Sequence, residues 1–227
     1  MPVVTIAQSK GGAGKTTLTL ALASEYAALG GIVTVLDADR QNSMVNWYND
    51  RLAEDRAGTG ITVVDASQLR DVDIGNAIKR AKADASLVLV DSEGTSNFKT
   101  AYAAQDSDYV VVPTRSSRLD LERTVETSEM LARMCKGIQF RVLITQTGQV
   151  ARSKAELEID RQISSAFPTF DERMHTLDAF RAMSNYRMTL NEVQQAGLAK
   201  CERARAIAQG VLATILEDLK GKDRVNG

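Results

Sequence analysis

The segment that most constrains the fold spans residues 10–17 and follows the predicted strand at residues 3–8. It contains three glycines, and a stretch of helical periodicity follows it and stops at Gly30-Gly31. Glycine tolerates backbone conformations that bring N–H groups close to an anion, and a helix that begins at Lys15 directs the positive end of its dipole at the same place. The segment therefore predicts a strand, a phosphate-binding loop and a helix in succession.

Two side chains of this loop have the chemistry that a nucleoside triphosphate requires. Lys15 is placed to reach the β- and γ-phosphates, and the Thr16 hydroxyl is placed to ligate Mg²⁺. The generic loop pattern begins with a glycine, whereas this chain has Ser9 there, followed by a second lysine, Lys10. We expect ATP and Mg²⁺ as cofactors, bound by Lys10, Gly11, Gly12, Ala13, Gly14, Lys15, Thr16 and Thr17.

Short runs rich in Val and Ile alternate with longer stretches of helical period, which predicts repeated β-α-β units. The predicted strands cover 3–8, 32–37, 61–65, 87–91, 109–113 and 140–145, and the predicted helices cover 15–29, 43–52, 68–83, 119–134, 153–166 and 199–219. Most of these strands are continuous apolar runs, as in a sheet buried on both faces. We expect an α/β fold of the P-loop NTPase type, with a doubly wound, mostly parallel sheet and helices on both faces. With 44% hydrophobic residues, the chain 1–227 is expected to form a single domain with a flexible tail at 220–227.

Three aspartates follow predicted strands, at the edge where open α/β sheets bind ligands. Asp37 and Asp39 end the second strand, and Asp91 ends the apolar run Leu87-Val88-Leu89-Val90. We expect Asp37 and Asp91 to complete the metal site with Thr16, and Asp39 to orient the attacking water. The alternative is that Asp39, Asn42 or Ser43 caps the next helix.

The second lysine and the adjacent glycine pair make the loop similar to the deviant Walker A motif of the ParA/MinD family of ATPases. The segment from Asp37 to Gln41 resembles the DxDxQ motif that this family carries after its second strand. The resemblance implies an ATP-sandwich dimer in which Lys10 of one subunit reaches the phosphates of the other. It implies that the catalytic residues are Lys10, Lys15 and Asp39.

Two positions depart from the usual pattern of that family. Arg40 stands where a proline is usual, and Ser92-Glu93-Gly94-Thr95 stands where many relatives have Thr-Pro-Pro. The backbone amide of Gly94 is still able to sense a γ-phosphate at this place. No catalytic role is assigned to Glu93, which is either a surface charge or an adjustment of the site.

The resemblance is strongest to short ParA-type partition proteins and, at Met174-His175 and residues 178–183, to accessory ATPases that bring transfer DNA to a type IV secretion system. It implies nonspecific DNA binding by an ATP-bound homodimer, with hydrolysis stimulated by a centromere-binding or adaptor protein. A formal net charge of −1 requires a local basic patch for DNA, and the last predicted helix begins with Lys200, Arg203 and Arg205. The alternative is that these side chains form a solvated helix face.

Three other functions were considered, and each needs sequence features that the chain lacks or carries only in part. An electron-transfer reductase of this superfamily needs paired cluster cysteines, whereas Cys135 and Cys201 are isolated in sequence and are expected to be buried. A ligase related to dethiobiotin synthetase is disfavoured by Lys10 and the DxDxQ-like segment. A MinD-like membrane switch needs a terminal amphipathic helix, and residues 207–219 carry Glu217 and Asp218 without an aromatic residue. We expect a cytoplasmic, nucleoid-associated protein without stable membrane insertion, and a structural or exposed His175.

Overall fold

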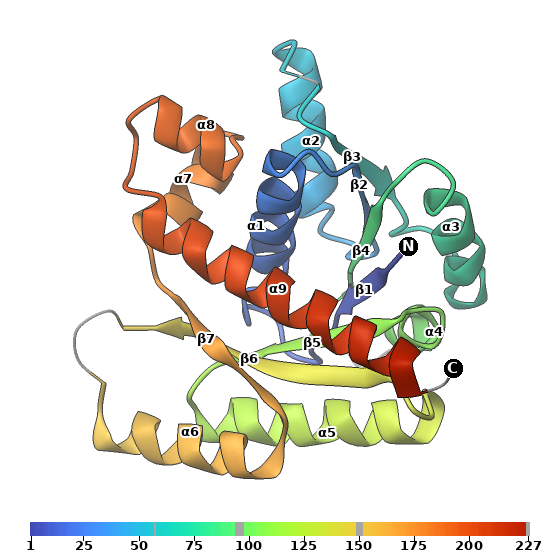
Figure 1. The fold of residues 1–227 in the computed structure, drawn as a ribbon, viewed down its shortest axis with the longest axis vertical. Coiled ribbons are helices and arrows are strands. Elements are labelled where there is room, and N and C mark those ends of the chain that lie inside the picture. Colours follow the sequence, from blue (N-terminus) through green and yellow to red (C-terminus); the bar gives the residue numbers. More distant parts are fainter. Residues whose placement is uncertain (57, 94–97, 149–151, 226–227) are drawn as a thin grey trace.

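The computed structural model describes residues 1–56, 58–93, 98–148 and 152–225. Within this part of the chain, seven parallel strands form one sheet in the order β3-β2-β4-β1-β5-β6-β7 (Figure 1). The strands are β1 Val3–Ile6, β2 Val33–Asp37, β3 Ile61–Asp65, β4 Leu87–Asp91, β5 Tyr109–Thr114, β6 Gln139–Thr147 and β7 Thr169–His175. The predicted α/β class is confirmed, and the described sheet is parallel throughout.

Helices cover both faces of the sheet (Figure 1). On one face lie α1 Lys15–Ala28, α2 Ser43–Ala53, α7 Asp178–Asn185, α8 Leu190–Gln195 and α9 Glu202–Val225. On the other lie α3 Ile74–Ala81, α4 Phe98–Gln105, α5 Arg118–Met134 and α6 Lys154–Ala166, with the short helix η1 Asp71–Asp73 before α3.

Side chains alternate along each strand and so contribute to the hydrophobic clusters on both faces of the sheet. In β1, Val4 and Ile6 pack in the cluster under α1 and α9, whereas Val3 packs against α3 on the opposite face. Because successive residues of a strand point to opposite faces, a strand covered on both sides must be apolar throughout. The central position of β1 places its carboxyl end, and the loop that follows it, in the middle of one sheet edge.

The structure differs from the predicted elements at several places. The edge strand β7 was not predicted because three charged residues, Asp171, Glu172 and Arg173, interrupt its apolar pattern. Within β7 only Phe170 and Met174, which flank this charged run, are buried. The short helices α4, α7 and α8 were also not predicted, and the expected helix 68–83 is replaced by η1 and the shorter α3. The last helix begins at Glu202 and continues to Val225, whereas the predicted helix covered residues 199–219.

Candidate functional site

The loop between β1 and α1 has the backbone geometry of an anion cradle. Gly12 and Gly14 have φ angles of +75° and +89°, which side chains other than glycine rarely allow, and Gly14 is the residue that caps α1. Lys15 is 6% exposed, and its Nζ donates to the carbonyl of Lys10 at 3.3 Å. Burial lowers the pKa of Lys15, against the attraction of nearby Asp91. The lysine is thus folded over the loop that is predicted to hold phosphate.

A cleft of about 460 Å³ opens at the mouth of this loop. It brings together Lys15, Thr16 and Asp39, which were predicted as site residues, with Arg40 and Glu93, the two departures from the family pattern. The cleft is lined by Gly11, Gly12, Gly14, Lys15, Thr16, Thr17, Asp39, Arg40, Gln41, Glu93 and Gln146. Ala13 is buried beneath the loop. The proposed γ-phosphate sensor Gly94 lies outside the described residues.

Asp91 is a buried carboxylate that lacks the partners such a group normally has. It is 1% exposed, and among the described residues neither of its carboxylate oxygens has a hydrogen-bond partner. Burial raises its pKa to about 7, while Thr16 and Lys15 act in the opposite direction. An ionised buried carboxylate is costly unless a cation or donor compensates it. The geometry therefore fits a cation beside Asp91.

Asp37 lies opposite Asp91 on the neighbouring strand β2. Its Oδ2 accepts hydrogen bonds from the backbone N–H groups of Met44 and Val45 at 2.9 and 3.1 Å, so Asp37 caps α2. Burial raises the pKa of Asp37 against these backbone hydrogen bonds. Of the three residues considered as alternative caps, Asn42 occupies the cap position of α2 but makes no side-chain bond to the helix, and Ser43 is the first helical residue. Asp39 accepts from Gln41 N–H at 2.9 Å.

Two carboxylates and the Thr16 hydroxyl form an oxygen-only donor set, which is what Mg²⁺ selects. Mg²⁺ usually takes one or two protein carboxylates and keeps waters and phosphate oxygens as its other ligands. Asp91, whose carboxylate oxygens accept no hydrogen bond from the described residues, and its neighbour Asp37 fit that role. Among the described residues no cluster of three or more His, Cys, Asp or Glu side chains is arranged to hold a metal by itself.

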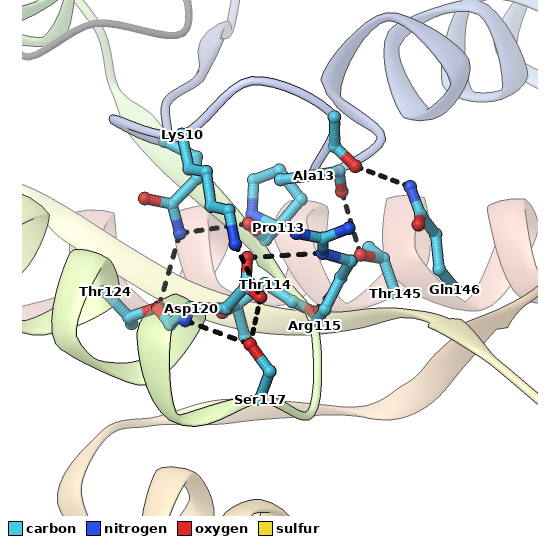
Figure 2. Close-up of polar contacts among 12 residues, drawn as sticks. Lys10, Ala13, Pro113, Thr114, Arg115, Ser117, Asp120, Thr124, Thr145 and Gln146 are labelled. Atoms are coloured by element: carbon cyan, nitrogen blue, oxygen red, sulfur yellow. Dashed lines mark hydrogen bonds and ion pairs between the residues drawn. The ribbon is translucent and has the colours of Figure 1, made fainter.

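The Lys10 side chain extends to Asp120 (Figure 2), and Lys10 is not among the residues that line the cleft. Its Nζ donates to Asp120 Oδ2 at 3.1 Å, and Arg115 Nε donates to Asp120 Oδ1 at 3.3 Å. Asp120 begins α5, is fully buried, and accepts a further bond from the hydroxyl of Ser117. Burial alone would raise the pKa of Asp120, but the bonds from Ser117, Lys10 and Arg115 hold it below its usual range. The sequence analysis did not identify this partner for Lys10.

The strand β6 supports the phosphate loop from below (Figure 2). Thr145 Oγ1 donates to the carbonyl of Ala13 at 2.8 Å, and Gln146 Nε2 donates to the carbonyl of Gly12 at 2.6 Å. Because these donors satisfy loop carbonyls, they orient the peptide units of the loop. Both residues lie at the carboxyl end of a parallel strand, which is the signal that would have identified them.

A second cavity of about 380 Å³ adjoins the first across Gly14, Thr17 and Gln146, which line both. Its other walls come from the end of β6, from the end of β7 with the residues that follow it, and from α7, and they are more apolar than those of the cleft. They comprise Thr145, Met174, His175, Thr176, Leu177, Phe180, Arg181, Ser184 and Asn185. The sequence analysis missed this cavity because it missed β7 and α7.

The three predicted DNA contacts differ in how available they are. Lys200 and Arg203 are exposed. Arg205 is half-buried and forms an ion pair of 3.0 Å with Glu25 of α1, whose side chain is fully buried. Arg203 Nη2 lies 2.8 Å from Nε2 of His175. Of the three, Arg205 is therefore committed to holding α9 on α1.

In the part of the chain that the structure describes, no helix has both the length and the apolar character needed to cross a bilayer.

Comparison with known proteins identifies relatives over the full length of the chain. Protein ParA of Rhizobium radiobacter is 29% identical over 230 residues, covering 97% of this chain and 100% of the relative. A plasmid partition protein of Borrelia burgdorferi B31, solved with AMPPNP bound, has a similar fold, with a TM-score of 0.73 and 12% identity over 96% of this chain and 99% of that one. The MinD cell division protein of Aquifex aeolicus also has this fold, with a TM-score of 0.71 and 16% identity over 95% and 97% of the two chains.

The family model described as VirC1 protein matches residues 1–222. That match shows that the chain belongs to the VirC1 protein family, and the solved structures show that its fold is of the ParA/MinD type.

Proposed function

We propose that this chain is a Mg²⁺-dependent ATPase whose ATP-bound form dimerises and binds DNA without sequence preference. Hydrolysis resets the cycle, and the protein positions or partitions DNA. The observation that carries the proposal is the pair of adjoining cavities, one at the phosphate loop and one with apolar walls, which share Gly14, Thr17 and Gln146. A nucleotide matches such a pair of cavities, because its phosphates are polar and its base is flat and largely apolar.

In this proposal each side chain has a defined task. Lys15 contacts the β- and γ-phosphates, and backbone N–H groups of residues 11–17 surround them. Thr16 and Asp91 hold Mg²⁺, directly or through water, and Asp37 contacts its water shell. The metal, when bound, offsets the charge that develops on the transferred phosphoryl group.

Asp39 has a further task, because it lines the cleft and its Oδ1 accepts from the N–H of Gln41 in its own turn. We assign it the orientation of the attacking water. Water held in line with the phosphorus removes much of the entropy cost of reaction, so a small displacement of this carboxylate would slow hydrolysis.

Lys10 supplies the link between dimerisation and hydrolysis. In the structure its ammonium is held by Asp120, so the proposed cycle requires it to leave that partner and reach the phosphates of a second subunit. A cation supplied in this way contributes roughly 10³ to 10⁵ in rate in finger-type systems. Hydrolysis by an isolated subunit should therefore be slow, and a partner protein that promotes the correct dimer would accelerate it.

Nonspecific DNA binding needs phosphate contacts, and Lys200 and Arg203 are the exposed candidates at the start of α9. Two copies in a dimer would double the number of contacts and steepen the dependence on salt. Binding of this kind would associate the ATP-bound protein with the nucleoid, and an adaptor that binds the cargo DNA would supply its specificity.

The test is binding to a nonspecific DNA duplex with ATP, ADP or no nucleotide, over a series of salt concentrations. The proposal expects tight binding with ATP alone, weakened by salt, and loss of the ATP effect in Lys15→Ala. If no nucleotide state binds DNA, the DNA part of the proposal fails. Sedimentation with anionic liposomes would then test a MinD-like alternative with protein cargo.

Delivery of DNA to a type IV secretion system is the second candidate. The observation that favours it is the similarity of Met174-His175 and residues 178–183 to accessory ATPases of DNA transfer. A strain that carries the Lys15→Ala variant distinguishes the two. Loss of plasmid retention with normal transfer supports partition, and loss of transfer with normal retention supports delivery.

A further inference from the structure

Three consecutive residues at the end of β6 connect different parts of the molecule. Thr145 and Gln146 donate to carbonyls of the phosphate loop, and the Thr147 hydroxyl lies 2.7 Å from Nδ1 of His175 on β7. Gln146 has a φ of +53°, and the register between β6 and β7 shifts between Thr145 and Thr147, which places Thr147 opposite His175. A left-handed backbone conformation is unfavourable for a residue other than glycine and persists only where its surroundings fix it.

The hydrogen bonds of His175 define its protonation state. Arginine has only N–H donors, so Nε2 must accept the bond from Arg203 Nη2 at 2.8 Å. The proton of the neutral ring is then on Nδ1, and the Thr147 hydroxyl accepts it. The bond to Arg203 therefore exists only while the imidazole is neutral.

The charges around the ring favour this neutral form. Burial, followed by the charge of Arg203 on α9, lowers the pKa of His175, and Arg173 on β7 and Arg152 before α6 act in the same direction. A hydrogen bond with the backbone of Gly148 acts against them. Both Arg152 and Arg173 are in turn paired with the buried carboxylate of Asp160 on α6.

His175 is also a wall of the second cavity, together with Gln146, Gly14 and Thr17. A ligand in that cavity therefore meets the imidazole and the support of the phosphate loop at the same time. The same ring contacts Arg203 through Nε2, and Arg203 is an exposed cation in the first turn of α9. The ring thus contacts a surface charge and lines a cavity.

We propose that His175 is a positioning residue that couples occupation of the cavity to the orientation of Arg203. With the cavity empty, the imidazole holds the Arg203 guanidinium against the protein. A nucleotide base or ribose beside the ring displaces it from Arg203, and the guanidinium becomes available to a DNA phosphate. This inference rests on the proposed function for the identity of the ligand and of the DNA partner. The coupling is reciprocal, so DNA would raise the affinity for the nucleotide by the same factor.

The chain has a single histidine, so a ¹H–¹⁵N correlation spectrum of the imidazole reports on His175 without assignment by mutation. In the nucleotide-free protein we expect the Nδ1–H tautomer, and Arg203→Ala should raise the pKa of the ring because it removes the nearest cation. Saturating AMPPNP with Mg²⁺ should shift the Nε2 resonance of the wild type. Arg181→Ala is the matched control, because Arg181 lines the same cavity but pairs with Asp178 at the surface.

The coupling itself is measured as the ratio of DNA affinities with and without saturating AMPPNP, with saturation checked by titration for each variant. Thr147→Val removes the hydroxyl that fixes Nδ1, without lining the cavity, and should reduce the ratio by roughly fivefold or more, the lower end of usual coupling between sites. Thr147→Ser keeps the hydroxyl and should restore the ratio.

The inference is overturned if bound AMPPNP leaves the His175 resonances unchanged, or if Arg203→Ala leaves the pKa of the ring unchanged. An unchanged ratio in Thr147→Val also contradicts it. If the wild type binds no DNA in any nucleotide state, the proposed function fails, and the imidazole spectra still decide whether cavity and Arg203 are coupled.

Discussion

Replacing Asp120 by asparagine tests how firmly Lys10 is held in the subunit that carries it. The carboxylate is fully buried and accepts bonds from Lys10 at 3.1 Å, from Arg115 at 3.3 Å and from Ser117. Asparagine keeps the shape, but it is neutral and cannot balance two cations. A hydrogen bond to a charged group contributes about 1.5–3 kcal/mol. Breaking a fully buried ion pair costs about 3–5 kcal/mol.

The expected loss for Asp120→Asn is about 2–3 kcal/mol, below the fully buried limit, because Lys10 and Arg115 are 28% and 35% exposed and can return to water. For a chain of this length that loss lowers Tm by about 5–10 °C. The pKa of Asp120 is held low in the folded protein, so its stabilisation is present above the unfolded value of about 4 and is lost as the pH falls through the folded value.

The assay is urea unfolding of Asp120→Asn, Lys10→Ala and the double variant, which gives the coupling energy of the pair. Asp178→Asn is the control, because Asp178 and Arg181 form an exposed pair that is expected to contribute less than about 0.5 kcal/mol. The reasoning is refuted if Asp120→Asn costs no more than this control, or if Lys10 and Asp120 show no coupling energy.

Four further predictions concern the site. Lys15→Ala should abolish binding of a fluorescent ATP analogue, since it removes the cation that contacts the phosphates; retained binding would contradict its assignment. Lys10→Ala should bind the analogue but hydrolyse ATP about 10³-fold more slowly in a phosphate-release assay, and an unchanged rate would remove Lys10 from the mechanism. Asp91→Asn should unfold at higher urea than wild type near pH 8 without Mg²⁺. The raised pKa of Asp91, about 7, means that the wild type loses stability as the pH rises from about 4 through 7, so the difference should vanish in acid. Arg203→Ala should weaken ATP-dependent DNA binding at unchanged stability, whereas Arg205→Ala should also lower Tm because its partner on α1 is buried; equal stability of the two variants would contradict this distinction.

The parts of the fold that were predictable are those with strong local signals. Strands buried on both faces, such as β4 with Leu87-Val88-Leu89-Val90, are apolar without interruption and are evident in the sequence. The edge strand β7 has one solvated side and three consecutive charged residues, so its pattern is weak although its pairing with β6 is well defined. The short helices α7 and α8 owe their stability to packing against α1, which no local pattern encodes.

The candidate site likewise has parts that local sequence signals predict and parts that depend on contacts distant in sequence. That the loop residues and the three aspartates lie near one another was predictable, because the carboxyl ends of parallel strands meet at one edge of the sheet. The capping of α2 by Asp37 was not, because it joins a strand end to a helix start through a turn whose path the sequence leaves open. The partnership of Lys10 with Asp120 spans 110 positions, and that of His175 with Arg203 depends on a strand that was not predicted.

The central claim is that ATP changes the assembly state through this loop, and light scattering of the purified protein tests it most directly. The account predicts the 24.7 kDa monomer without nucleotide and with ADP, and twice that mass with AMPPNP and Mg²⁺ in the wild type but not in Lys15→Ala. A mass that is the same in every nucleotide state, or a dimer that forms equally well with Lys15→Ala, would contradict it.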